Sequence, residues 1–114
     1  MNIKIVKNLI SKNDLAEIAK NQFGDLVKSV VDVKKEIMAV GGELHADEEA
    51  LLLERGSKQE DLWGVNLYIE KPEDEWIEFD SMINIRPSRG NRSRGVESLE
   101  IQRKIRDIVN KLVL

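Results

Sequence analysis

Residues 26–40 have the sequence LVKSVVDVKKEIMAV, and this stretch decides the fold class. Over residues 26–33 the side chains alternate along the chain and β-branched valines dominate, which predicts a strand. The polar residues Lys34, Lys35 and Glu36 predict a turn into a second strand at 37–40. The glycines Gly41 and Gly42 follow directly and predict a bulge or a close approach of the backbone.

Further strands are predicted on both sides of this stretch. Residues 1–7 alternate isoleucine with lysine and predict a short first strand. Residues 62–69 and 76–85 predict two more strands, because their apolar side chains recur at every second position. Turn-forming residues at 71–74 separate these two strands.

Residues 46–56 are compatible with two structures. Asp47 could cap a short helix through Glu54 with Gly56 behind it, and the leucines and glutamates favour that helix. Alternatively, residues 50–54 form a strand that turns at 55–57 and pairs with 62–69. We favour the strand, because four consecutive apolar residues would leave a short helix apolar on more than one face.

Two helices are predicted, one near each end of the chain. Ser11 is the predicted N-cap of the first helix, and Gly24 ends that helix as a left-handed cap. Ser98 is the predicted N-cap of the last helix. One face of the last helix is apolar, and it carries Ile101, Ile105, Ile108 and Leu112.

These elements predict an α+β fold in a single domain over residues 1–114. We expect a mostly antiparallel sheet of four to five strands, in the order β-α-β-β-(β)-β-β-α, with two helices on one face. If the helices cover the apolar face, the opposite face carries polar and aromatic side chains and suits ligand binding or dimerisation. The members of this polar face would be Asn66, Tyr68, Trp76, Glu78, Asp80 and Asn84.

Composition restricts the class of protein. The chain of 114 residues contains no cysteine, so disulfides and cysteine-ligated metal sites are excluded. We expect a cytoplasmic protein without a membrane partner, because the first residues lack a secretory pattern and the apolar runs are too short to cross a bilayer. Residues 43–80 carry a net charge of −10 and residues 81–114 one of +5. This asymmetry disfavours nucleic acid as a partner, and together with the polar face it predicts a homodimer.

Arginine is concentrated in residues 86–95, whose sequence is RPSRGNRSRG. Guanidinium groups bind phosphate or carboxylate with two hydrogen bonds, and small neighbouring residues let backbone N–H groups join them. We predict that this loop binds a phosphate-containing small molecule, with the polar sheet face and His45 completing the pocket. The alternative is that the arginines neutralise acidic groups of the same molecule or of a neighbouring subunit. The predicted binding residues are Arg86, Arg89, Asn91, Arg92 and Arg94.

His45 and Asp47 are the candidates for catalysis or metal binding. On a strand, residues two apart project to one side, and imidazole and carboxylate are both metal ligands. Histidine also suits proton transfer near neutral pH. An alternative function is therefore a small hydrolytic or metal-dependent enzyme, and a further one is a protein-interaction module. A structural role for His45 stays open, and no organic cofactor is implied.

Three segments carry a resemblance to a known family. They are GGELHAD at residues 41–47, GSKQEDLWG at 56–64 and INIRP at 83–87. This pattern resembles a small family of uncharacterised bacterial and archaeal proteins of unknown function. The resemblance extends over nearly the whole chain and implies one domain, but it supplies no activity and no functional residue.

Overall fold

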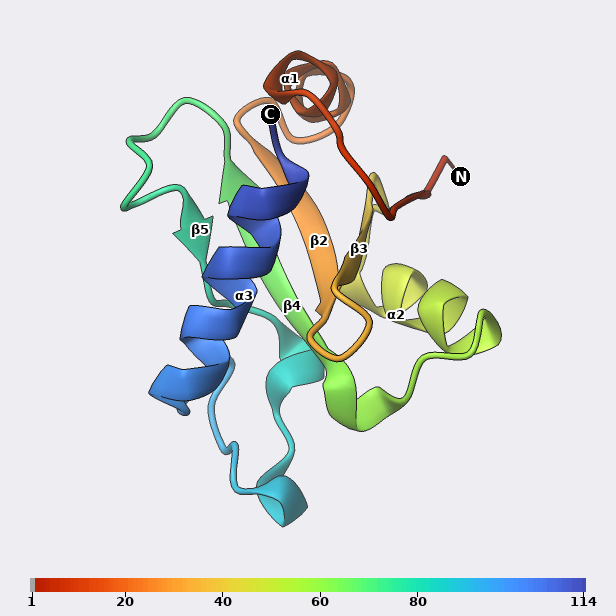
Figure 1. The fold of residues 1–114 in the computed structure, drawn as a ribbon, viewed down its shortest axis with the longest axis vertical. Coiled ribbons are helices and arrows are strands. Elements are labelled where there is room, and N and C mark those ends of the chain that lie inside the picture. Colours follow the sequence, from red (N-terminus) through yellow and green to blue (C-terminus); the bar gives the residue numbers. More distant parts are fainter. Residues whose placement is uncertain (1) are drawn as a thin grey trace.

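One antiparallel sheet organises the chain. The computed structural model describes residues 2–114. Within these residues, five strands lie in the order β1-β3-β2-β4-β5, and every neighbouring pair is antiparallel (Figure 1). The strands are β1 (Lys4–Val6), β2 (Leu26–Asp32), β3 (Ile37–Val40), β4 (Leu62–Tyr68) and β5 (Ile77–Glu78). Three α-helices accompany the sheet in the described part of the chain, so the predicted α+β class is confirmed.

The turn between β2 and β3 is fixed by a buried carboxylate. Asp32 Oδ1 accepts hydrogen bonds from the backbone N–H groups of Lys34 and Lys35, each at 2.9 Å. Its other oxygen accepts one from the Ser57 hydroxyl at 2.7 Å. Glu36 then adopts a φ of 57°, which lets the chain reverse into β3. The turn and the two strands predicted from residues 26–40 are thus confirmed.

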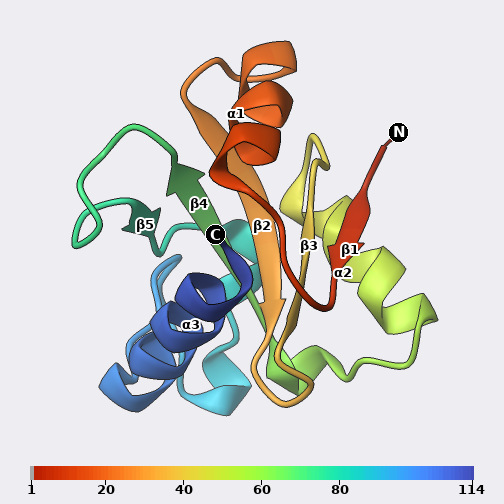
Figure 2. The same ribbon diagram turned by 45° about the horizontal axis from the view of Figure 1, so that its top comes forward.

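Two helices pack on one face of the sheet, as predicted. They are α1 (Lys12–Asn21) and α3 (Leu99–Leu112), and Figure 2 shows them together over the β2 and β4 strands. Their predicted caps are confirmed, since Ser11 Oγ accepts from Asp14 N and Ser98 Oγ accepts from Ile101 N. None of the helices within residues 2–114 has the length and apolar character needed to cross a membrane. The core between helices and sheet includes Leu15, Val27, Val31, Val65, Leu67, Ile105 and Leu112.

A third helix, α2 (His45–Glu54), covers part of the opposite face, so the strand favoured for residues 50–54 is wrong. The helix begins after Leu44 rather than at Asp47. Leu52 is fully buried and packs with apolar residues of the sheet, whereas Leu53 is 39% exposed. The run of apolar residues is therefore tolerated in a helix because only part of it enters the core. The apolar partners of Leu52 include Val30, Ala39 and Leu62.

The two glycines after β3 allow close approaches, as predicted. A Cβ on Gly41 would lie 2.7 Å from the carbonyl oxygen of Asn2, and Gly41 has a φ of +93°. A Cβ on Gly42 would lie 2.7 Å from Cγ of Glu48. The Gly42 N–H also donates to Glu48 Oε2 at 2.9 Å. Gly42 therefore lets the fully buried Glu48 hold the start of α2 against the end of β3, and Gly41 lets Asn2 approach the chain.

The strand predicted over residues 76–85 is mostly absent. Only Ile77 and Glu78 pair with β4, and the chain then forms short 3₁₀ helices at Met82–Asn84 and Pro87–Arg89. Beyond that pairing, the Asn84 side chain takes over the hydrogen bonds of β4, since it accepts from Gly64 N at 2.8 Å and donates to Gly64 O at 3.0 Å. Trp76 lies in the core beneath the helices, so its predicted place on the polar face is wrong.

Candidate functional site

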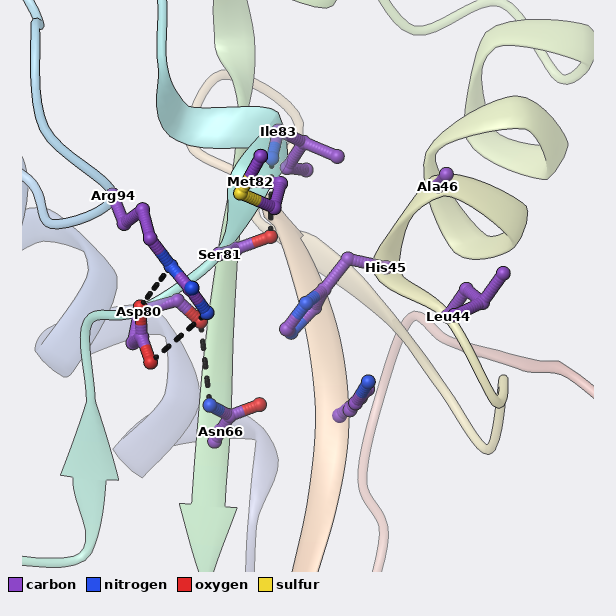
Figure 3. A pocket seen from close by; sticks show the side chains of 10 residues that line it. Leu44, His45, Ala46, Asn66, Asp80, Ser81, Met82, Ile83 and Arg94 are labelled. Carbon is purple, nitrogen blue, oxygen red and sulfur yellow. Dashed lines mark hydrogen bonds and ion pairs between the residues drawn. The ribbon is translucent and has the colours of Figure 1, made fainter.

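The polar face of the sheet contains a pocket beside the start of α2, and we call it the α2 pocket. Its volume is about 300 Å³. Figure 3 shows that its walls come from the beginning of α2, from β4 and from the segment that follows β5. The lining residues are Lys28, Leu44, His45, Ala46, Asn66, Asp80, Ser81, Met82, Ile83 and Arg94.

The pairing register places the polar floor of this pocket. Lys28 on β2 is the direct partner of Asn66 on β4, and Asn66 is the direct partner of Glu78 on β5. Direct partners in an antiparallel pair project from the same face, so these three side chains form a row across the sheet, of which Lys28 and Asn66 line the pocket. Asn66 and Asp80, which were both predicted on the polar face, line the pocket.

A glycine in β4 makes room for the side wall. A Cβ on Gly64 would lie 2.6 Å from both Cβ and Oγ of Ser81 and 3.2 Å from Cδ2 of His45. Those distances are shorter than ordinary contacts between heavy atoms, which are about 3.5–4.0 Å. His45 and Ser81 therefore reach their places in the wall because residue 64 has no side chain.

His45 is the first residue of α2 and is 8% exposed. Its Nε2 lies 2.8 Å from the carbonyl oxygen of Val65, and because a carbonyl only accepts, Nε2 carries the proton. This tautomer leaves Nδ1 as an acceptor. Burial lowers the pKa of His45 below its ordinary value of 6.5, against the hydrogen bond to Val65, which raises it. The positive charge of Lys28 is the next largest influence and lowers the pKa of His45 further. The His45 side chain in the pocket wall is therefore uncharged at neutral pH.

Arg94 and Asp80 form a two-point ion pair at the far side of the pocket. Arg94 Nε lies 2.7 Å from Asp80 Oδ1, and Arg94 Nη2 donates to Oδ2 at 3.3 Å (Figure 3). Asn66 Nδ2 donates to the Asp80 carbonyl at 3.3 Å and to Glu78 Oε1 at 2.9 Å. Both partners of Nδ2 are acceptors, which fixes the orientation of the amide. Asn66 Oδ1 is buried and has no hydrogen-bond partner within residues 2–114.

The other predicted arginines lie elsewhere, so the structure does not bring the four together. Arg86 is 9% exposed, donates to the carbonyls of Leu62 and Ile83, and stacks 4.9 Å from the Trp63 ring centroid. Arg89 pairs with Glu60, its Nη1 lying 3.1 Å from Oε2. Arg86 and Arg89 line a separate hollow of about 220 Å³, away from Arg94.

Asn91 and Arg92 hold the loop in shape. Asn91 is 4% exposed, and its Nδ2 donates to the carbonyls of Asn84, Ser93 and Gly95. The backbone N–H of Arg92 donates to Glu97 Oε2 at 2.7 Å, and the Arg92 side chain is exposed. Asn91 therefore serves the loop's own backbone.

His45 and Asp47 do not project to one side, because they lie in a helix and not in a strand. Residues two apart on a helix do not face each other. Within residues 2–114, no group of three or more His, Cys, Asp or Glu side chains is placed to hold a metal ion. Sequence reasoning did not select Lys28, although a lone lysine in an otherwise mostly apolar strand was a usable signal.

Comparison with known proteins gives one result. A family model described as "Protein of unknown function (DUF5674)" matches residues 4–112. The chain therefore belongs to this family, which confirms the resemblance to an uncharacterised family. No curated protein and no solved structure matches the chain.

Proposed function

We propose that this member of the family binds a small anionic ligand in the α2 pocket. The observation that supports this most strongly is the unpaired ammonium of Lys28 beside the uncapped start of α2. Among residues 2–114, Lys28 forms no ion pair, and the one carboxylate that lines the pocket, Asp80, is already paired with Arg94. The pocket therefore has positive charge to offer a ligand.

The start of α2 adds hydrogen-bond donors to this charge. The residue before the helix is Leu44, which provides no side-chain cap. The carbonyl of Leu44 accepts hydrogen bonds from the N–H groups of Asp47 and Glu48. The N–H groups of His45 and Ala46 therefore have no acceptor within the helix. Both residues line the pocket. Unsatisfied N–H groups and the positive end of the helix dipole together favour an anion.

Lys28 is well placed to act with the helix start. It lines the α2 pocket and also a neighbouring hollow of about 510 Å³, and Leu44 borders both. Its Nζ lies 5.0 Å from the centroid of the Phe23 ring. An anion in the α2 pocket itself, away from Glu43 in the neighbouring hollow, would meet Lys28 on one side and the start of α2 on the other.

The proposed ligand site shares Arg94, His45 and the polar sheet face with the site expected from sequence. It differs in the role of the remaining arginines. Arg86 completes the backbone hydrogen bonds of β4, and Arg89 is paired with Glu60. Arg86 therefore supports the framework of the sheet, and Arg89 lies in an exposed ion pair at the surface.

Titration calorimetry at low salt with inorganic phosphate and with acetate tests the proposal. We expect saturable binding that weakens as salt rises, and a loss of about tenfold or more in Lys28→Gln, since a hydrogen bond to a charged group contributes roughly 1.5–3 kcal/mol. Lys104→Gln is the matched control, because Lys104 lies on α3 and is 57% exposed. If Arg89→Gln loses binding and Lys28→Gln does not, the anion site is on the arginine loop and the proposal is wrong.

A further inference from the structure

The polar groups of the α2 pocket are divided into a donor side and an acceptor side. The donor side is the start of α2 with Lys28. On the acceptor side, Asn66 Oδ1 has no partner in the described chain although Asn66 is only 8% exposed. Figure 3 shows the amide nitrogen of Asn66 turned toward Asp80 and the oxygen turned away from it, toward the His45 side.

This acceptor side points to a ligand that carries an N–H group. The Asn66 amide cannot flip without losing both bonds from Nδ2, so its oxygen stays an acceptor. The tautomer of His45 leaves a second acceptor, Nδ1, in the same wall. An oxyanion placed against Asn66 Oδ1 would be repelled, whereas a ligand N–H would satisfy it. The ligand therefore needs an anionic group and an N–H donor a few atoms apart.

The mouth of the pocket is apolar. Leu44 is 56% exposed and Met82 is 66% exposed, and both line the pocket. They lie on either side of His45 in Figure 3, Leu44 just before α2 and Met82 in the segment after β5. Exposed aliphatic side chains around a polar floor favour a ligand with an aliphatic group of its own.

Building on the proposed function, we propose that the ligand is an α-amino carboxylate with an aliphatic side chain. Its carboxylate binds at the start of α2 and Lys28, its N–H donates to Asn66 Oδ1, and its side chain packs against Leu44 and Met82. A free aliphatic amino acid and the C-terminal residue of a peptide share this chemistry. The volume of about 300 Å³ suits a group of this size.

Three probes with the same isobutyl group and carboxylate test the inference: leucine, N-acetyl-leucine and 4-methylpentanoate, which lacks the nitrogen. Titration calorimetry should show that at least one of the first two binds about tenfold more tightly than 4-methylpentanoate, as expected for one buried hydrogen bond. Tighter binding of leucine identifies a free amino acid as the ligand, and tighter binding of N-acetyl-leucine identifies a peptide C-terminus.

The Asn66→Ala variant supplies the second half of the test. The preference for the nitrogen-bearing probe should disappear in this variant, so that this probe and 4-methylpentanoate bind with equal affinity. Asn66→Ser is measured in parallel in case the alanine variant does not fold, and Asn110→Ala on α3 is the control. Equal binding of all three probes to the wild type, or an unchanged preference in the folded Asn66 variant, overturns the inference. Binding of phosphate alone also overturns it and leaves the proposed function standing, whereas binding of no probe at all removes both.

Discussion

Gly64→Ala is the substitution that most specifically perturbs the α2 pocket. The φ of Gly64 is not in the left-handed region, so alanine can adopt the backbone conformation. The added Cβ, however, would lie 2.6 Å from Ser81 Cβ and Oγ, about 1 Å closer than an ordinary contact. Ser81 cannot move freely, because its N–H donates to the Arg94 carbonyl at 2.9 Å and its Oγ accepts from Ile83 N.

The expected cost follows from this geometry. Overpacking at a tight site costs about 1–3 kcal/mol. For a chain of 114 residues this lowers the melting temperature by about 4–12 °C. The displaced Ser81 and His45 also distort the pocket wall, so phosphate and acetate should bind more weakly to Gly64→Ala than to the wild type.

Differential scanning calorimetry and ligand titration measure both effects. Gly95→Ala is the matched control, since a Cβ there would make only ordinary contacts of 3.5 and 3.6 Å and its φ is also not left-handed. The substitution Ser81→Gly should cost less in the Gly64→Ala background than in the wild type, because it removes the clashing atoms. A Gly64→Ala protein as stable as the wild type, with unchanged ligand affinity, would refute the contribution of Gly64 to the pocket.

Two further predictions concern α2. Burial raises the pKa of Glu48 well above its ordinary value, against the hydrogen bond from Gly42, which lowers it. The folded protein therefore binds the Glu48 proton more tightly than the unfolded chain does. The resulting gain in folding stability is complete below the pKa of Glu48 in the unfolded chain, and it is lost as the pH rises through the pKa of Glu48 in the folded protein. Urea unfolding should show less decline in stability from about pH 5 to about pH 8 in Glu48→Gln than in the wild type, and equal declines would contradict this. Leu52→Ala should destabilise the protein by about 2–5 kcal/mol through the cavity it leaves under α2, whereas Leu53→Ala, at a position 39% exposed, should cost much less in the same urea assay.

Much of the fold could be predicted because the decisive signals are local. Ser11 and Ser98 each accept a hydrogen bond from the backbone N–H group three residues further on, so a short stretch of sequence is enough to predict where each helix begins. The alternation of side chains in residues 26–33 likewise indicates that the central strand has one apolar face and one mixed face. Helix α2 was missed because Leu52 packs into the core while its neighbour Leu53 is partly exposed, which weakens the helical period.

The failed predictions depend on contacts distant in the chain. Residues 76–85 have the alternation of a strand, but the backbone of β4 that they would pair with is satisfied at Gly64 by the Asn84 side chain and at Leu62 by Arg86. No local pattern shows that a side chain will replace a strand. The same holds for the arginines, since closeness in sequence did not reveal that Arg89 would pair with Glu60 and Arg94 with Asp80. The polar sheet face was predictable in part, because strand alternation places Asn66 on it.

The homodimer and the low expectation of nucleic acid as a partner stay predictions. Sedimentation of the protein at high concentration tests the first, and a mass near 13.0 kDa would count against it. A binding assay with single-stranded and double-stranded oligonucleotides tests the second, and tight binding at moderate salt would contradict it.

A proton–nitrogen correlation NMR titration of the wild-type protein with acetate and phosphate tests anion binding at the start of α2 most directly. The amide signals of His45 and Ala46 should shift saturably, because their N–H groups would gain an acceptor, and the same shifts should be absent in Lys28→Gln. Signals of Arg89 and Arg92 should move little, since they lie outside the α2 pocket. Saturable shifts confined to residues 86–92, or no saturable shift at His45 and Ala46, would contradict an anion site in the α2 pocket.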